Sequence, residues 1–216
     1  MNAAEWIEDV GQVFPMKELN IGDASRLKVS GMTFFTRAFK AQGLGHVCLM
    51  EATGFFGWMN MTTLVVAPTE IDLPLCSMEF IRAMGKVKFL GELYETRIIP
   101  CPLEELRKTA LRYEGLKSYR PKPAWYDSLR VEECIFKEGK KAQQEQFAHA
   151  AKDFLSAYLS TPAAVVEDLE EKRKKTSAYV EGLLEKGGPA VNVFKKSLGE
   201  EKTADFLRKI MFGTAY

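Results

Sequence analysis

The 216-residue chain has little of the chemistry that usually marks a cofactor site. It contains four cysteines, with no C-x-x-C pair among them, and two histidines, so neither a zinc site nor a chain-borne iron–sulfur cluster is indicated. It also has no G-x-G-x-x-G and no G-x-x-x-x-G-K-[ST] motif, so no dinucleotide or P-loop site is recognisable. These absences predict a chain that binds no metal or cofactor and takes the electrons for any redox chemistry from outside.

Net charge and long apolar runs are lacking too. A formal net charge of +1 argues against a strongly basic nucleic-acid binder. No apolar run reaches the roughly 20 residues that span a bilayer, and the first ten residues are acidic and amphipathic where a secretion signal would be basic and then apolar. We therefore expect a cytoplasmic protein that binds neither nucleic acid nor membrane. Two lysine clusters could still attract an acidic partner: Lys86 with Lys88, and residues 172–175 with Lys195 and Lys196.

What the chain does contain is a series of alternating apolar segments followed by helical ones. Strand-like alternation occupies residues 27–39, 47–52, 58–66 and 87–99. Helical patterns occupy residues 103–113, 142–159, 163–184 and 200–211. Strands joined by short turns favour an antiparallel sheet, and helices that follow them predict an α+β fold in which the helices cover the sheet. The length fits a single domain over residues 1–216.

Two glutamates, Glu51 and Glu79, lie in apolar segments on either side of the turn Asp72-Leu73-Pro74. A carboxylate buried among apolar side chains is costly unless it is paired or used. Such surroundings also raise its pKa towards values suited to giving a proton near neutrality. The two glutamates are therefore a candidate acidic pair for proton chemistry. The structural alternative is that Glu51 pairs with a lysine or arginine at the sheet edge, and that the turn only fixes chain direction.

Four segments, in order along the chain, resemble blocks of one known family. They are the strand that carries Glu51, VVAPTEIDLPL at 65–75, PAWYDSLRVEECIF at 123–136 and GEEKTADFLRKIMFG at 199–213. In these segments the chain is similar to the ferredoxin-dependent bilin reductases, a family that includes the red chlorophyll catabolite reductases of plants. The resemblance implies a three-layer α/β/α sandwich with a central antiparallel sheet, in which C-terminal helices cover the ligand pocket.

The resemblance also implies a function and site residues. It implies that a linear tetrapyrrole, a bilin such as biliverdin, is reduced by single electrons from reduced ferredoxin, through a bilin radical that acidic side chains protonate. Glu51 is similar to a family glutamate near the substrate, and Glu79 falls where the family usually has a central aspartate, so both are predicted to be catalytic. Thr63 and Gly188 are predicted to lie at the substrate. Thr63 stands where phycocyanobilin-forming relatives have a histidine, and Gly188 replaces the aspartate of an Asp-Pro-Ala-Arg motif.

These departures from the family pattern leave two alternatives open. A threonine hydroxyl can form hydrogen bonds but cannot act as an acid near neutrality. The chain could therefore be a tetrapyrrole-binding protein of the same fold without reductase activity, or a reductase of a chlorophyll catabolite or another open-chain tetrapyrrole. Bilin propionates would call for basic partners near the pocket, and the sequence does not rank the candidates Arg37, Arg82, Arg97 and Arg130.

Overall fold

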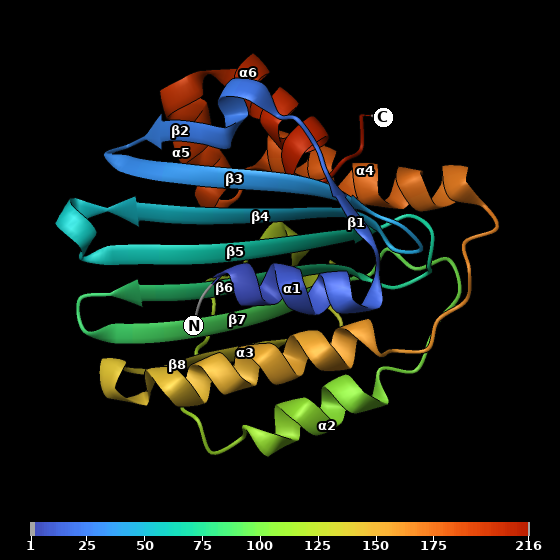
Figure 1. Cartoon of the computed structure of the whole chain (residues 1–216), viewed down its shortest axis with the longest axis horizontal. Coiled ribbons are helices and arrows are strands. Elements are labelled where there is room, and N and C mark those ends of the chain that lie inside the picture. The colour runs from blue at the N-terminus through green and yellow to red at the C-terminus, as the bar shows by residue number, and fades with distance from the viewer. Residues whose placement is uncertain (1–2, 216) are drawn as a thin grey trace.

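An antiparallel sheet of eight strands forms the middle layer of the protein in this computed structural model, which describes residues 3–215 (Figure 1). Residues 1–2 and 216 of the predicted domain lie outside the described residues. The strand order is β1-β3-β4-β5-β6-β7-β8, and β2 also pairs with β3. The strands are β1 (Met16–Glu18), β2 (Arg26–Val29), β3 (Met32–Ala41), β4 (Gly45–Gly54), β5 (Met59–Pro68), β6 (Leu75–Ala83), β7 (Lys86–Tyr94) and β8 (Ile135–Lys140).

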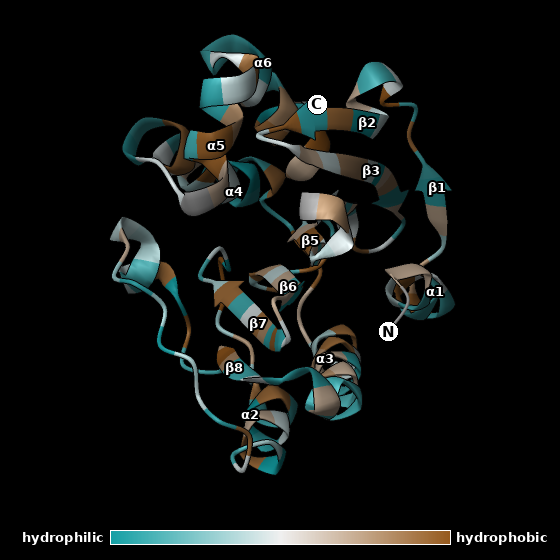
Figure 2. Cartoon of the chain, turned by 90° about the vertical axis from the view of Figure 1, so that its left-hand side faces the viewer, coloured by the Kyte–Doolittle hydropathy of each residue, from teal (hydrophilic) through white to brown (hydrophobic). Residues whose placement is uncertain are grey.

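Helices cover both faces of this sheet (Figure 2). One face carries α1 (Ala3–Val13), α2 (Glu104–Arg112) and α3 (Gln144–Leu159). The other carries α4 (Leu169–Lys186), α5 (Pro189–Leu198) and α6 (Glu200–Asp205), and the last continues as a π-helical segment, η5 (Phe206–Met211). Short 3₁₀ turns complete the chain: η1 (Gly22–Ser25), η2 (Phe55–Gly57), η3 (Trp125–Leu129) and η4 (Lys141–Gln143). The predicted α/β/α sandwich with an antiparallel sheet and C-terminal helices is confirmed.

Each face of the sheet has its own hydrophobic core, because successive side chains of a strand point to opposite faces. On the first face, Phe89 of β7 packs edge-on against Phe154 of α3, with ring centroids 5.9 Å apart. On the second face, Phe34 of β3 packs against Phe194 of α5 at 5.1 Å. Among the described helices, none is long and apolar enough to cross a membrane.

Several element bounds differ from the sequence prediction. The helix expected from residue 163 begins at Leu169, because Val165 forms a β-bridge with Ile71 and the Asp168 side chain caps the helix by accepting from the Glu171 N–H at 2.9 Å. The strand expected to reach residue 99 ends at Tyr94. Five elements were not among the predicted segments: β1, β6, β8, α1 and α5. The half-polar sequence of β8 carries no clear alternation.

The turn that contains Asp72 is held by a buried charge. The Asp72 carboxylate is 2% exposed and accepts the N–H groups of Ile98 and Ile99 at 2.9 and 2.7 Å. Lys172 of α4 donates to it at 2.9 Å. Burial acts to raise the pKa of Asp72, but these donors outweigh it and hold the pKa below its ordinary value. The interpretation of this turn as a structural element is therefore supported by its contacts.

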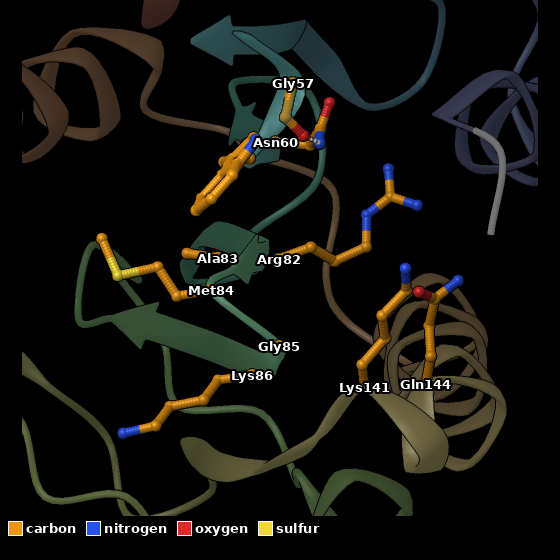
Figure 3. A pocket seen from close by; sticks show the side chains of 10 residues that line it. Gly57, Asn60, Arg82, Ala83, Met84, Gly85, Lys86, Lys141 and Gln144 are labelled. Atoms are coloured by element: carbon orange, nitrogen blue, oxygen red, sulfur yellow. Dashed lines mark hydrogen bonds between the residues drawn. The ribbon is translucent and has the colours of Figure 1, made fainter. Parts of the chain in front are cut away.

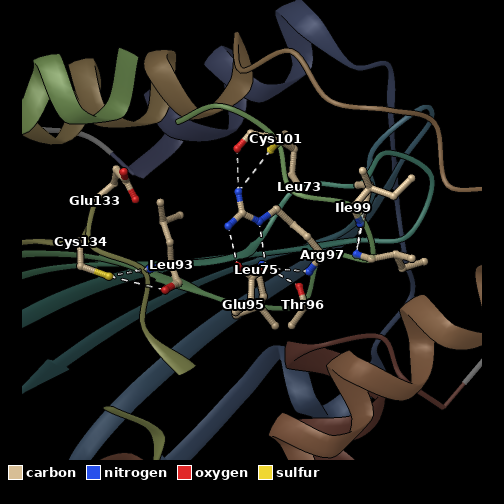
Figure 4. A network of polar contacts seen from close by, with 12 residues as sticks. Leu73, Leu75, Leu93, Glu95, Thr96, Arg97, Ile99, Cys101, Glu133 and Cys134 are labelled. Atoms are coloured by element: carbon tan, nitrogen blue, oxygen red, sulfur yellow. Dashed lines mark hydrogen bonds and ion pairs between the residues drawn. The ribbon is translucent and has the colours of Figure 1, made fainter. Parts of the chain in front are cut away.

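Lys172 completes this arrangement as a fully buried cation. Its ammonium group also donates to the carbonyl oxygens of Leu73 at 2.6 Å and Thr96 at 3.1 Å, so all three of its N–H bonds have acceptors. In the same segment the Arg97 guanidinium donates to the carbonyl of Cys101 at 2.8 Å (Figure 4). These bonds join α4 to the segment after β7, and they remove Lys172 from any surface that could bind a partner.

Candidate functional site

A row of side chains crosses the sheet on the face covered by α4–α6. The strand register pairs Thr36 with Met50, Met50 with Thr63, Thr63 with Glu79, and Glu79 with Leu90. Directly paired residues project to the same face, and Met50 belongs to the second core. We call these five residues the Glu79 row. It brings together two of the predicted site residues, Thr63 and Glu79, as direct cross-strand neighbours.

Glu79 is the titratable group of this row. Its side chain is partly buried, and burial, with a smaller effect of the Glu92 carboxylate, raises the pKa of Glu79 from 4.5 to about 7. An acid with such a pKa is divided between its protonated and ionised forms at neutrality. That is the condition under which a general acid works best.

The two threonines of the row have unused hydroxyl groups. Thr36 is 2% exposed and Thr63 is 3% exposed, and within residues 3–215 neither Oγ1 atom has a hydrogen-bond partner. Buried polar groups in folded proteins are almost always paired, so an unpaired one needs an explanation. Both hydroxyls lie on the same stripe of the sheet as Glu79, where a polar ligand could supply the missing partner.

A second carboxylate, Glu92, lies on the same face, diagonally across from Glu79 in the register of β6 and β7. Its Oε1 atom accepts the Tyr94 hydroxyl at 2.9 Å and lies 2.6 Å from the Arg130 guanidinium, which also binds Asp127. Burial acts to lower the pKa of Arg130, but the Glu92 charge outweighs it and keeps the pKa above its ordinary value. The second face therefore contains a paired carboxylate, Glu92, beside Glu79, whose pKa is raised to about 7.

Aromatic side chains form the wall next to this pair. The rings of Tyr94 and Tyr179 lie 4.5 Å apart between centroids, and Tyr126 packs edge-on against Tyr94 at 5.7 Å. Trp125 donates its indole N–H to the carbonyl of Gly187 at 2.8 Å. A Cβ atom at Gly182 would lie 2.2 Å from the Trp125 ring, so only glycine lets α4 come this close. These contacts attach η3 to α4 and to the start of α5.

Glu51 does not lie at this site. Its cross-strand partners are Phe35 and Thr62, which place it on the opposite face of the sheet from Glu79. The side chain is exposed to solvent. The expectation that Glu51 lies in an apolar sheet interior and pairs with Glu79 is therefore wrong, because the alternation of β4 turns Met50, and not Glu51, towards the second core.

Gly188 lies on the same side of the sheet as Thr63 and Glu79. It is the residue before α5, has an extended backbone and accepts the Asn192 N–H at 3.1 Å. Its neighbour Gly187 receives the Trp125 indole N–H, so Gly188 adjoins the aromatic wall. Among the described residues, no group of three or more histidine, cysteine, aspartate or glutamate side chains could hold a metal ion.

Several residues of this site were not predicted from the sequence: Thr36, Met50, Glu92, Tyr94, Tyr126 and Tyr179. One signal could have corrected the choice of Glu51. Glu51 and Thr53 are polar and two residues apart, whereas Met50 and Ala52, which precede each of them, are apolar. The structure agrees, because Glu51 and Thr53 are exposed and Met50 and Ala52 are buried. This period-two alternation assigns Glu51 to the solvent side of its strand. Glu92 had no such signal, because its cross-strand register with Glu79 could not be read from the sequence.

Comparison with known proteins agrees with the architecture. No protein-family model and no curated protein matches the chain. The structure is similar to the crystal structure of phytochromobilin synthase from tomato in complex with biliverdin, with a TM-score of 0.75 and 16% sequence identity over 98% of this chain and 81% of that chain. The chain therefore shares the fold of a bilin reductase.

Proposed function

We propose that this chain, acting as a single domain, reduces a linear tetrapyrrole that binds between the sheet and α4–α6. The observation that carries the proposal is Glu79, a partly buried acid whose pKa is raised to about 7 and which lies beside two unpaired buried hydroxyls. The fold similarity to a protein that was crystallised with biliverdin supports a bilin as the ligand. The unpaired hydroxyls of Thr36 and Thr63 would form hydrogen bonds to polar atoms of the bilin.

The electron source in this proposal is reduced ferredoxin, which delivers one electron at a time. Reduction of one double bond takes two electrons and two protons, and the bilin is a radical after the first electron. Glu79 gives a proton to the bilin and, because it is partly exposed, recovers one from water before the next step. Burial raises the pKa of Glu79, and the nearby Glu92 carboxylate, which is bound by Arg130 and Tyr94, adds to this effect.

A second candidate function has its own support. Thr63 and Leu90 flank Glu79 in the row and neither is an acid, so proton transfer depends on a single side chain. A protein that binds a tetrapyrrole without reducing it would need no acid at all. In that case the Glu79 row would serve only as a polar contact to the ligand.

The experiment is an anaerobic assay of the purified chain with biliverdin and reduced ferredoxin, followed by absorbance. Glu79→Gln is compared with Glu51→Gln, which changes the same residue type on the other face. We expect Glu79→Gln to bind biliverdin but to slow its consumption by about 100-fold or more, whereas Glu51→Gln stays close to wild type. A spectral shift on binding without turnover in wild type would support the binding protein. Equal turnover in Glu79→Gln and wild type would remove Glu79 from the mechanism.

A further inference from the structure

At one end of the sheet, exposed apolar and basic side chains surround a hollow of about 440 Å³ (Figure 3). The β4–β5 connection contributes Trp58, which is 72% exposed, and the β6–β7 hairpin contributes Met84, which is 85% exposed. Basic residues lie around both. We call this group the hairpin-end surface: Trp58, Arg82, Met84, Lys86, Lys88 and Lys141.

The cations of this surface have few carboxylate partners. Within residues 3–215, no carboxylate lies within 4.0 Å of the charged groups of Arg82, Lys86 or Lys141. Lys88 reaches Glu138 at 4.0 Å, and Glu138 is bound more closely by Lys117 at 2.5 Å. The hairpin-end surface therefore presents positive charge that the described part of the chain leaves available.

The other lysine cluster is different, because three of its lysines have carboxylate partners within the protein. Lys172 is fully buried against Asp72. Lys174 lies 3.5 Å from Glu171, and Lys195 lies 3.7 Å from Glu200. Of the two clusters, the one at the hairpin ends combines unpaired cations with the more exposed apolar side chains, Trp58 and Met84.

The tip of the β6–β7 hairpin holds its methionine in an unusual conformation. Met84 and Gly85 have φ values of 49° and 76° between the paired residues Ala83 and Lys86, as in a type I′ turn. Asparagine and glycine are the usual residues at such positions, and methionine is rare there. The chain thus keeps a flexible apolar side chain in solvent at a backbone position that does not favour it, which is typical of a binding surface.

The hairpin-end surface adjoins the Glu79 row. Ile81 follows Glu79 by two residues on β6, so both point to the same face, about 7 Å apart along the strand. Ile81 pairs directly with Lys88 on β7. A partner that covers this surface would therefore lie at the edge of the face where the tetrapyrrole is proposed to bind.

We infer that the hairpin-end surface is the docking site of the electron donor, an iron–sulfur protein with a carboxylate-rich face. The inference rests on the proposed function, in which electrons come from outside. Opposite charges would steer the two proteins together, and Trp58 would become buried at the centre of the contact. Each docking event transfers one electron, so two donor molecules are oxidised for every double bond reduced. A hollow between cations fits a protruding acidic segment better than it fits the flat surface of a membrane.

The test measures binding of the full chain to an acidic [2Fe–2S] ferredoxin at low and near-physiological ionic strength, without bilin. The variant is Lys86→Glu with Lys141→Glu. Its control is Lys174→Glu with Lys196→Glu, which changes the same charge at exposed lysines of the other cluster. We expect the first pair to weaken binding by about tenfold or more at low salt and the control pair by less than about twofold. Trp58→Ala should weaken binding at both salt concentrations.

Turnover of biliverdin with dithionite as the chemical reductant separates this inference from the proposed function. If the hairpin-end variants lose ferredoxin-driven turnover but keep dithionite-driven turnover, the inference holds. The inference is overturned if ferredoxin binds the Lys86/Lys141 variant as tightly as wild type. It is also overturned if ferredoxin binds neither protein, and binding of anionic lipid vesicles to wild type but not to the variant would then identify a membrane as the partner. Absence of biliverdin turnover with every reductant would instead count against the proposed function, and the binding data would still decide the docking site.

Discussion

Comparable charged side chains have opposite surroundings on the two faces of the sheet. On the α1–α3 side, Glu51 is exposed, and the pair of Arg37 with Glu18 has both side chains 49% exposed. On the α4–α6 side, the pair of Arg130 with Glu92 has side chains 15% and 11% exposed, and Glu79 beside it is partly buried. The residue types and the bond lengths are alike. The difference lies in how much water each group keeps.

This difference determines what the groups can do chemically. Charges that remain in contact with water interact weakly, whereas charges removed from water interact strongly with their neighbours. Among residues 3–215, it is on the second face alone that burial and a nearby carboxylate combine to bring an acid to a pKa near neutrality. The difference between the faces therefore predicts that proton transfer takes place on the second face, and this can be tested on the two faces in parallel.

The largest difference is expected for the two ion pairs. Arg130→Gln leaves Glu92 with little water and without its cation, so we expect the free energy of unfolding to fall by about 2–4 kcal/mol. Arg37→Gln removes an exposed pair and should cost less than about 1 kcal/mol. Urea denaturation of both variants at neutral pH checks this. Equal losses in the two variants would mean that the faces do not differ in how they bury charge.

A smaller difference is expected in the pH dependence of stability. Between pH 4.5 and about 7 the unfolded Glu79 ionises while the folded one keeps its proton, so this residue lowers the stability of wild type as the pH rises through that window. Glu79→Gln removes the effect and should gain about 1–3 kcal/mol over wild type from pH 4 to pH 8. Glu51→Gln should show no such gain.

Thermal and urea unfolding of the three proteins across this pH range provide the measurement. A parallel pH dependence of wild type and Glu79→Gln would show that Glu79 titrates at its ordinary pKa. The general-acid role would then lose its physical basis. If instead Glu51→Gln showed the gain, the assignment of the two faces would be reversed.

The sequence predicted the architecture better than the site. Alternating apolar residues and helical periodicity were enough for the layered fold, because both patterns follow from local geometry. Glu79 and Thr63 were found as single residues, and the register makes them neighbours. Glu51 was chosen by its residue type, and the alternation within its own strand was given too little weight.

Other features could not be predicted from the sequence at all. The pairing of Glu92 with Arg130 joins residues 38 apart in the chain, and it depends on how η3 folds back over β7. The buried state of Lys172 depends on Asp72, which lies 100 residues away. Lysine patterns along a helix do not distinguish a solvated face from a buried cation. Long-range contacts of this kind are set by tertiary packing, and local propensity contains no information about them.

The smallest stability effect is expected at Thr63, which can be compared with a threonine on the other face of the sheet. Its buried hydroxyl has no partner among the described residues, so Thr63→Val removes a desolvated polar group and should raise stability by up to about 1 kcal/mol. The matched change Thr53→Val, at an exposed position of the first face, should leave stability unchanged.

If the Thr63 hydroxyl forms a hydrogen bond to a bilin, the same Thr63→Val protein should bind biliverdin about fivefold more weakly, since that hydrogen bond is lost. A variant that is more stable and yet binds less well would show that this hydroxyl is kept for the ligand and not for the fold. A clear loss of stability would mean that Thr63 has a partner within the folded chain.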